Sequence, residues 1–425
     1  MRPSLSRFAS PLAALAVIAL ACCSPPMVPA PISGRQPPYY GYGRVPPPGA
    51  PPPPPSVPPA AAAAGPAKVA LLVPLSGANA ELGHAILDAA QLALFEASGD
   101  RLVLVPRDTG GNAAGAASAA RAVIADGARL ILGPLLAAEV EAVKPIAQEA
   151  HINVIAFSTV TGLAGGNVYL MGFLPRQEVV REVGYARQRG LQRFAALAPN
   201  SPYGHLMADA LREAASTSGG TVAKVEFFDP RTGEASPAIQ RLLPGGAADP
   251  AAAPSAASPP AASAHLAFDA LLLPEGGAAL KQIAGQVKAA AGSEKPVQLL
   301  GSGLWDTPEI GIDPALVGGW FASSPPEARQ DFERRFSATY GHNPPRLASL
   351  GYDSAALAAV LSRGQGGEQF SQQAILNPSG FTGVDGLFRF TPNGLVQRGL
   401  AVLEVEPQGT TVVSPAPQTF QDLGY

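Results

Sequence analysis

Two short patterns contain residue types that could support catalysis. Asp108-Thr109-Gly110 matches the Asp-Thr-Gly triplet of aspartic proteases, whose mechanism needs two carboxylates that share one proton. The chain holds no second copy of this triplet, and the first copy follows a predicted strand, so we interpret it as a strand-end turn. Ser302 lies in Gly-Ser-Gly, without the Gly-x-Ser-x-Gly frame of a nucleophile elbow. We therefore expect a non-enzymatic protein.

Metal and nucleotide chemistry also lack their sequence signatures. The five histidines contain no pair spaced four residues apart and no His-Glu-x-x-His motif. A P-loop lysine motif is missing as well. We expect neither a metal nor a cofactor.

The charge of the chain argues against nucleic acid as a partner. It has 29 Lys and Arg residues against 32 Asp and Glu residues, which gives a formal net charge of −3. Because these charges are spread along the sequence, no basic face is available to neutralise phosphates.

The first 21 residues are typical of a secretion signal. Arg2 and Arg7 precede an uninterrupted apolar stretch from Pro11 to Ala21, which is too short for a membrane span of roughly 20 residues. Ala21 and Cys22 then resemble the lipobox of bacterial lipoproteins, in which a thiol that follows a small residue accepts diacylglycerol. We expect residues 1–21 to be a lipoprotein signal peptide and Cys22 to be lipidated. The alternative is an ordinary signal peptide with two incidental cysteines.

Residues 22–67 are predicted to form a disordered tether. Between Ser24 and Pro66, 17 of 43 residues are Pro, and most others are small, so this segment cannot bury a core. A polyproline II segment rises about 3.1 Å per residue, which allows a reach on the order of 130 Å.

From residue 68 onward, short apolar runs alternate with segments of helical spacing, which predicts α/β architecture with parallel sheets. Lys68–Leu75 is a nearly continuous apolar run, as expected for a strand covered on both faces. Further strands are predicted at residues 102–106, 130–132, 152–157, 194–198, 222–228, 268–273 and 297–301, with β-rich segments at 388–390 and 400–405. Residues 244–265 form an Ala, Pro and Ser tract without periodicity, which we interpret as a disordered insertion.

Seven segments in this order resemble the type 1 periplasmic binding fold, in the branch that contains leucine-binding proteins and penicillin-binding protein activators. They are Pro74–Gly77, Val105–Thr109, Ile131–Pro134, Ile152–Thr159, Ser201–Gly204, Leu299–Asp306 and Gly351–Ala355. The resemblance implies two lobes, each a parallel sheet flanked by helices, with a cleft between them. Lobe 1 would comprise residues 68–174 and 324–380, and lobe 2 would comprise residues 175–323 and 381–425.

In this fold, ligands bind at the carboxyl ends of the strands. The resemblance implies a ligand-binding cleft lined by Ser76, Leu135–Ala137, Ser158, Thr159, Thr161, Tyr203, Pro274, Glu275, Trp305 and Asp306. Asp306 or Glu275 would meet the ammonium of an amino acid. Trp305 either stacks on a ligand or caps the core beneath the cleft, and the sequence favours neither role.

The cleft departs from that of the amino-acid binders, because Leu135–Ala138 has no hydroxyl side chain where the family usually offers them. Together with the lipobox and the tether, this favours a penicillin-binding protein activator that regulates peptidoglycan synthesis. Its partner would be a peptidoglycan synthase, with a possible small polar ligand in the cleft, and it would be lipid-anchored at the periplasmic face of the outer membrane. The alternative is an amino-acid-type solute-binding protein that serves the permease of an ABC importer.

Overall fold

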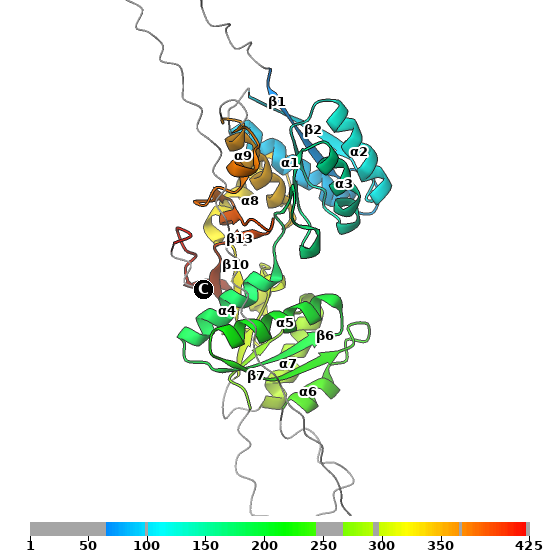
Figure 1. Ribbon diagram of the computed structural model, residues 1–425. Coiled ribbons are helices and arrows are strands. Elements are labelled where there is room, and N and C mark those ends of the chain that lie inside the picture. Colours follow the sequence, from blue (N-terminus) through cyan, green and yellow to red (C-terminus); the bar gives the residue numbers. More distant parts are fainter. Residues whose placement is uncertain (1–64, 98–100, 244–266, 292–296, 365–367, 422–425) are drawn as a thin grey trace, which may run out of the picture. The chain divides into compact units, whose positions relative to one another are not determined.

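The computed structural model describes residues 65–97, 101–243, 267–291, 297–364 and 368–421. The signal peptide, Cys22, nearly all of the tether and the insertion at 244–265 lie outside these residues. Strands and helices alternate through the first part of the described chain (Figure 1). They are β1 (Ala67–Val73), α1 (Ala80–Glu96), β2 (Leu102–Asp108), α2 (Ala113–Ala125), β3 (Leu130–Leu132), α3 (Ala137–Glu149), β4 (Asn153–Ala156) and β5 (Val168–Leu170).

These strands form one parallel sheet, in the order β2-β1-β3-β4-β5. After β5 a second series begins. It comprises α4 (Pro175–Gln188), β6 (Arg193–Pro199), α5 (Pro202–Thr217), β7 (Thr221–Phe228), α6 (Ser236–Leu242), β8 (Ala270–Leu272), α7 (Gly277–Ala291), β9 (Gln298–Leu300) and β10 (Trp320–Ser323).

The second sheet has seven strands in the order β15-β14-β10-β9-β8-β6-β7. Its last two strands, β14 (Ala401–Glu406) and β15 (Gly409–Ser414), come from the end of the chain and pair antiparallel. Between β10 and β14 the chain forms α8 (Pro326–Tyr340), α9 (Ala348–Leu361), α10 (Gln372–Ile375) and the antiparallel sheet β11 (Phe381–Gly383), β12 (Gly386–Phe390) and β13 (Val396–Arg398). Three short 3₁₀ helices complete the described elements: η1 (Thr161–Leu163), η2 (Gly303–Trp305) and η3 (Ile310–Ile312).

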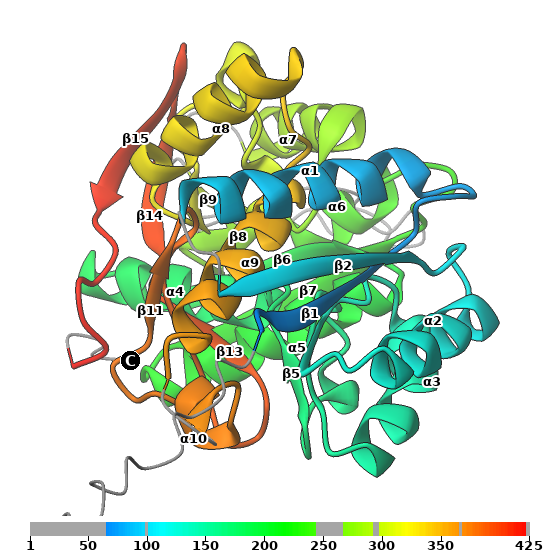
Figure 2. The same cartoon turned by 90° about the horizontal axis from the view of Figure 1, so that it is seen from above.

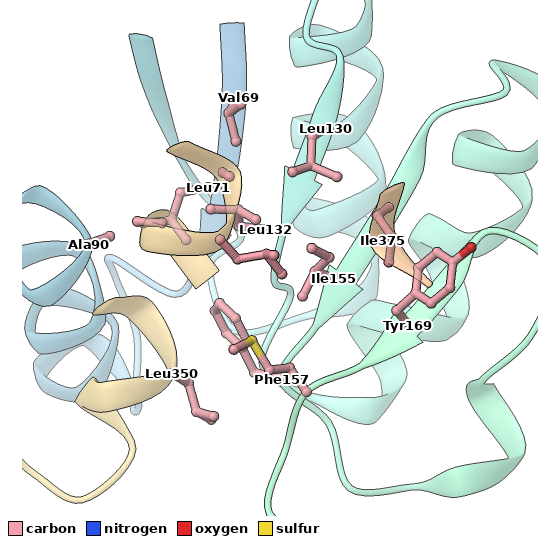
Figure 3. Packing of buried hydrophobic residues seen from close by; sticks show 14 of the residues in the cluster. Val69, Leu71, Ala90, Leu130, Leu132, Ile155, Phe157, Tyr169, Leu350 and Ile375 are labelled. Carbon is pink, nitrogen blue, oxygen red and sulfur yellow. The ribbon is translucent and has the colours of Figure 1, made fainter. Parts of the chain in front are cut away.

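Strand β1 shows why the first sheet needs helices on both faces. Val69 and Leu71 pack into a core with α1 and α9, whereas Ala70 and Leu72 pack into a separate core with α2 and α3. Successive strand residues point to opposite faces, so a continuous apolar run is stable only between two helical layers. Figure 3 shows the first of these cores, which contains Leu71 of β1, Leu132 of β3 and Ile155 of β4.

The second sheet follows the same rule. Ala195 and Leu197 of β6 pack with α6 and α7, while Phe194 and Ala196 pack with α4 and α5. The helical layers on the two faces can be followed in Figure 2. Strand β1 lies between β2 and β3, and β6 lies between β7 and β8, so each sheet has a switch in strand order. In open α/β sheets, ligands bind beside such a switch, at the carboxyl ends of the strands.

The strands predicted from the sequence are confirmed, with bounds that differ by a few residues, and helices alternate with them as expected. Five strands were not predicted: β5, β10, β11, β13 and β15. Three of these have only three residues each, which leaves no periodicity to detect.

The division into lobes stays a prediction, but the packing of one segment differs from it. Residues 381–398 were assigned to lobe 2, whereas Phe388, Phe390 and Val396 lie in the core of the first sheet. Strand β14 then joins the second sheet.

Helices α1 and α9 pack so closely that a side chain at Gly351 would clash. A Cβ atom there would lie 2.1 Å from the backbone oxygen of Ile86. We expect Gly351→Ala to lower the free energy of unfolding by about 1–3 kcal/mol, as overpacking does. Gly285 of α7 has no atom within 4 Å of such a Cβ, so Gly285→Ala should raise it by roughly 0.5–1 kcal/mol through helix propensity. Urea titration of both variants checks this pair, and equal effects would contradict the close contact.

Candidate functional site

A pocket of about 670 Å³ lies where strand ends of both sheets converge. Its lining includes residues that follow β1, β3 and β4 of the first sheet and β9 and β10 of the second. Most of its wall is apolar, with side chains from Leu82, Leu135, Leu136, Phe157, Phe173 and Leu304. Two larger hollows lie elsewhere, one beside α4 and α5 and one beside Arg129 and Phe370. The pocket at the strand ends is the candidate site, because its position fits the switch in strand order.

Part of the predicted site lines this pocket. Leu135–Ala137, Ser158, Thr159, Tyr203 and Asp306 are among its lining residues. Ser158 is buried, and its Oγ accepts a hydrogen bond from the Val160 amide at 3.2 Å. These residues were identifiable because they directly follow strands or begin helices.

Ser76, Thr161 and Glu275 are not among the lining residues. The Ser76 hydroxyl donates to Asp108 at 2.6 Å. Thr161 begins η1 and is exposed. The carboxylate of Glu275 accepts from the amide of Gly276 at 3.0 Å.

Trp305 lies in the core of the second sheet and not in the lining of the pocket. It is fully buried, its Nε1 donates to the Leu273 carbonyl at 3.2 Å, and its ring packs on Phe321. Two roles were considered for Trp305, stacking on a ligand and capping the core beneath the cleft. The position of the residue fits the second role. Pro274, also expected in the cleft, is buried and likewise outside the lining.

Asp306 lines the pocket but is already paired. Arg329 contacts both of its carboxylate oxygens, one of them at 2.8 Å, and Ser323 donates to it as well. Since this ion pair is mostly buried, Asp306 is poorly placed to exchange Arg329 for the ammonium of a ligand.

Sequence reasoning missed Arg346, the cation that lines the pocket. It precedes α9, and its guanidinium lies 4.0 Å from the ring centre of Phe173, with Nη2 2.8 Å from Asp385. It also donates to Ser324 at 3.2 Å. Arg346 follows no predicted strand, so no sequence signal placed it near the cleft.

Arg346 belongs to a buried charge cluster with Asp353, Asp385 and Arg398. Arg398 donates to the Met171 carbonyl at 2.8 Å, and Asp353 accepts from the Val384 amide at 2.7 Å. Burial and the neighbouring Asp385 raise the pKa of Asp353. Burial alone would raise the pKa of Asp385 too, but Arg346 and Arg398 lower it. The cluster contacts the connections after β5, after β10 and around β13, and so holds together the segments that link the two sheets.

Sequence reasoning also missed two carboxylates on α4. Glu178 lines the pocket, and its Oε2 accepts from the Gly303 amide at 2.8 Å. Burial raises its pKa to about 7, against the opposing effect of that hydrogen bond and of Arg346. Glu182, one turn further, is buried and accepts from the Ala322 amide at 2.8 Å. Burial raises its pKa well above the ordinary value, and Glu178 adds to this.

Tyr203 closes this side of the pocket at the start of α5. Ser201 caps the helix by accepting from the Gly204 amide at 3.2 Å. Burial raises the pKa of the Tyr203 hydroxyl, which is hydrogen-bonded to Ser302 and lies near Glu178 and Glu182. The hydroxyl therefore stays protonated at neutral pH.

Asp108 of the Asp-Thr-Gly triplet lies in a hydrogen-bonded turn at the end of β2. Asp108 accepts from Ser76 and from the amides of Leu75 and Gly110, a pattern that lowers its pKa and is typical of a turn. Among the described residues there is no group of three or more His, Cys, Asp or Glu side chains that could hold a metal ion. No helix in that part of the chain has the length and apolar character needed to cross a membrane.

The buried carboxyl of Glu182 makes a prediction about stability. When the pKa of a carboxyl is higher in the folded state than in the unfolded state, the protein becomes less stable as pH rises between the two values. In that pH window the unfolded state has released a proton that the folded state still holds. Glu182→Gln mimics the protonated form and does not titrate. We expect its free energy of unfolding to rise relative to that of the wild type by roughly 1.4 kcal/mol per pH unit within that window.

Thermal denaturation at pH 5, 6 and 7 checks this expectation. Glu234 is exposed, so Glu234→Gln is the control and should show no such trend. A stability difference between Glu182→Gln and the wild type that does not change with pH would contradict a neutral Glu182 in the folded state.

Comparison with known proteins identifies the family. The structure is similar to a candidate branched-chain amino acid ABC transporter protein of Rhodospirillum rubrum, with 20% identity, a TM-score of 0.69 and coverage of 82% of this chain and 100% of the other. It is also similar to a solute-binding protein from R. palustris in complex with benzoate (20% identity, TM-score 0.56, 83% and 98% covered). A third similar structure is the branched-chain amino acid binding protein LivJ from Streptococcus pneumoniae in complex with isoleucine (20%, 0.55, 82% and 100%).

A comparison with curated proteins found no match. These structural likenesses, below 25% identity, establish the fold. The family rests on a sequence model, described as periplasmic binding protein, that covers most of the chain. The chain belongs to the periplasmic binding protein family, whose model matches residues 66–410.

Proposed function

We propose that this protein is the solute-binding component of an ABC importer and binds a small solute that carries a carboxylate on an apolar body. The observation that carries this proposal is the mostly apolar pocket at the carboxyl ends of the strands, with Arg346 in its lining. Isoleucine and benzoate, named with two of the similar structures, share this chemistry. This ranks the importer above the penicillin-binding protein activator that the sequence favoured.

The apolar walls supply affinity and the polar groups supply orientation. Burial of a leucine-sized body contributes about 1.5–3 kcal/mol. The first amides of α3, at Ala137 and Ala138, have no partner within their own helix, and Ala137 lines the pocket, so this helix start offers donors for a carboxylate. Arg346 adds positive charge on the same pocket.

The polar groups of the site are arranged for binding and not for reaction, which supports a non-enzymatic role. Ser158 accepts from a backbone amide, Asp306 is paired with Arg329, and Tyr203 is bonded to Ser302. None of these arrangements pairs a nucleophile with a base. Family membership indicates a periplasmic protein, and lipidation of Cys22 at the outer membrane remains part of the proposal.

Regulation of peptidoglycan synthesis is the second candidate function. It is favoured by the lipobox-like Ala21-Cys22 and by the Pro-rich segment from Ser24 to Pro66, since a free transport receptor has little use for so long a spacer. Under this function the partner would be a peptidoglycan synthase, which the full chain should retain in a pull-down with purified synthases.

A single substitution in the pocket tests the importer proposal. Ala137 lines the pocket, whereas Ala138 is exposed and outside its lining. We expect Ala137→Phe to fill the pocket and weaken binding of leucine, isoleucine or benzoate at least tenfold, and Ala138→Phe to leave binding unchanged. Calorimetric titration and thermal shift measure this, since a ligand at 100 times its Kd adds about 2.7 kcal/mol. Absence of any binding by the wild type, together with retention of a synthase, would favour the second candidate.

A further inference from the structure

Glu178 is the one carboxylate in the lining of the pocket, within the described residues, that no cation contacts. The other acidic lining residue, Asp306, is held by Arg329 through both oxygens. Among the described residues, Glu178 takes part in no ion pair. Its fixed partner is the backbone amide of Gly303.

The position of Glu178 is set by its neighbours. It lies in the first turn of α4, and a Cβ atom at Gly303 would lie 2.7 Å from its Oε1. A side chain at position 303 would therefore push this carboxyl aside. With glycine there, the amide of Gly303 holds the carboxyl in the lining of the pocket.

The charged groups around Glu178 act on its ionisation in opposite directions. Arg346, before α9, favours the ionised form, and Asp306, after β9, opposes it. Burial raises the pKa of Glu182 on the same helix well above its ordinary value. Burial also raises the pKa of Tyr203 on α5, whose hydroxyl is neutral at pH 7. Burial therefore dominates and raises the pKa of Glu178 to about 7. Both protonation states are populated at neutral pH.

The two states recognise opposite groups. An ionised carboxylate in a mostly apolar wall is stabilised by a cation, so it favours a ligand with an ammonium. A protonated carboxyl is a hydrogen-bond donor, so it favours a ligand oxygen and tolerates an anion. We propose that Glu178 determines which second group the solute carries: the pocket prefers an amino acid when Glu178 is ionised and the corresponding simple carboxylate when it is protonated. This inference rests on the proposed binding of apolar carboxylates.

Two matched ligand pairs test it on the full-length protein: leucine with 4-methylpentanoate, and phenylalanine with 3-phenylpropanoate. Within each pair the apolar body is the same and the ammonium is present or absent, and all four keep their charge between pH 6 and 8. If Glu178 titrates near pH 7, its ionised fraction rises from about one-tenth to nine-tenths over this range. We expect the Kd of the amino acid to fall about tenfold and the Kd of the simple carboxylate to rise about tenfold.

Glu178→Gln should abolish both trends, because the amide does not titrate. Glu182→Gln is the matched control, one turn along the same helix and outside the pocket lining, and should retain both trends. The pKa of Asp353 is raised too, but Asp353 is present in both variants. A pH dependence caused by Asp353 would therefore persist in Glu178→Gln and can be told apart from one caused by Glu178.

Three results would overturn the inference. They are slopes of the same sign for both ligands of a pair, slopes that persist in Glu178→Gln, and slopes that disappear in Glu182→Gln. Each of these requires ligand binding and leaves the proposed function standing. Failure of all four ligands to bind at any pH would instead remove the proposed function and this inference with it.

Discussion

Strands with two buried faces are the constraint on which the rest of this structure depends. Val69 to Leu72 alternate between two separate cores, so neither face of β1 can be left to water. Parallel neighbours must then be joined by helices that cross over the sheet, and the loops after the strands all emerge at the same edge. Several polar residues of the pocket, among them Ser158, Thr159 and Asp306, come from these loops. A requirement for apolar burial therefore determines where binding chemistry can occur.

The charged side chains beneath the pocket are paired with groups of opposite charge. Arg329 compensates Asp306, and Arg346 and Arg398 compensate Asp385. Buried ions without partners are costly, and this arrangement leaves the pocket wall apolar although several ionisable groups lie close behind it. Arg346 serves both environments, because it lines the pocket and contacts Phe173 and Ser324 in the connections between the sheets. Arg346 therefore joins the pocket wall to these connections.

The sequence allowed much of the fold and about a third of the pocket lining to be predicted. Continuous apolar runs identified strands such as β1 and β6, and residues directly after strands, such as Ser158 and Thr159, were placed in the cleft. Glu178 and Arg346 were not predicted because their positions depend on tertiary packing. Glu178 lies on a helix and contacts the loop after β9 through Gly303, and Arg346 lies in a loop that is far in sequence from any predicted strand. Trp305 follows a strand in the same way as Asp306, yet its ring turns into the core, where its indole nitrogen finds the Leu273 carbonyl.

The late strands bear on the order in which the chain can acquire its structure. Strand β10 pairs with β14, and Trp320 contacts Glu404 across 84 residues of sequence. The first core also lacks Phe388, Phe390 and Val396 until the same stretch arrives. During synthesis, β10 therefore remains an open edge and both cores remain incomplete until nearly the whole chain exists. Neither core can therefore be completed by its first strands and helices alone, because both depend on residues between 388 and 405.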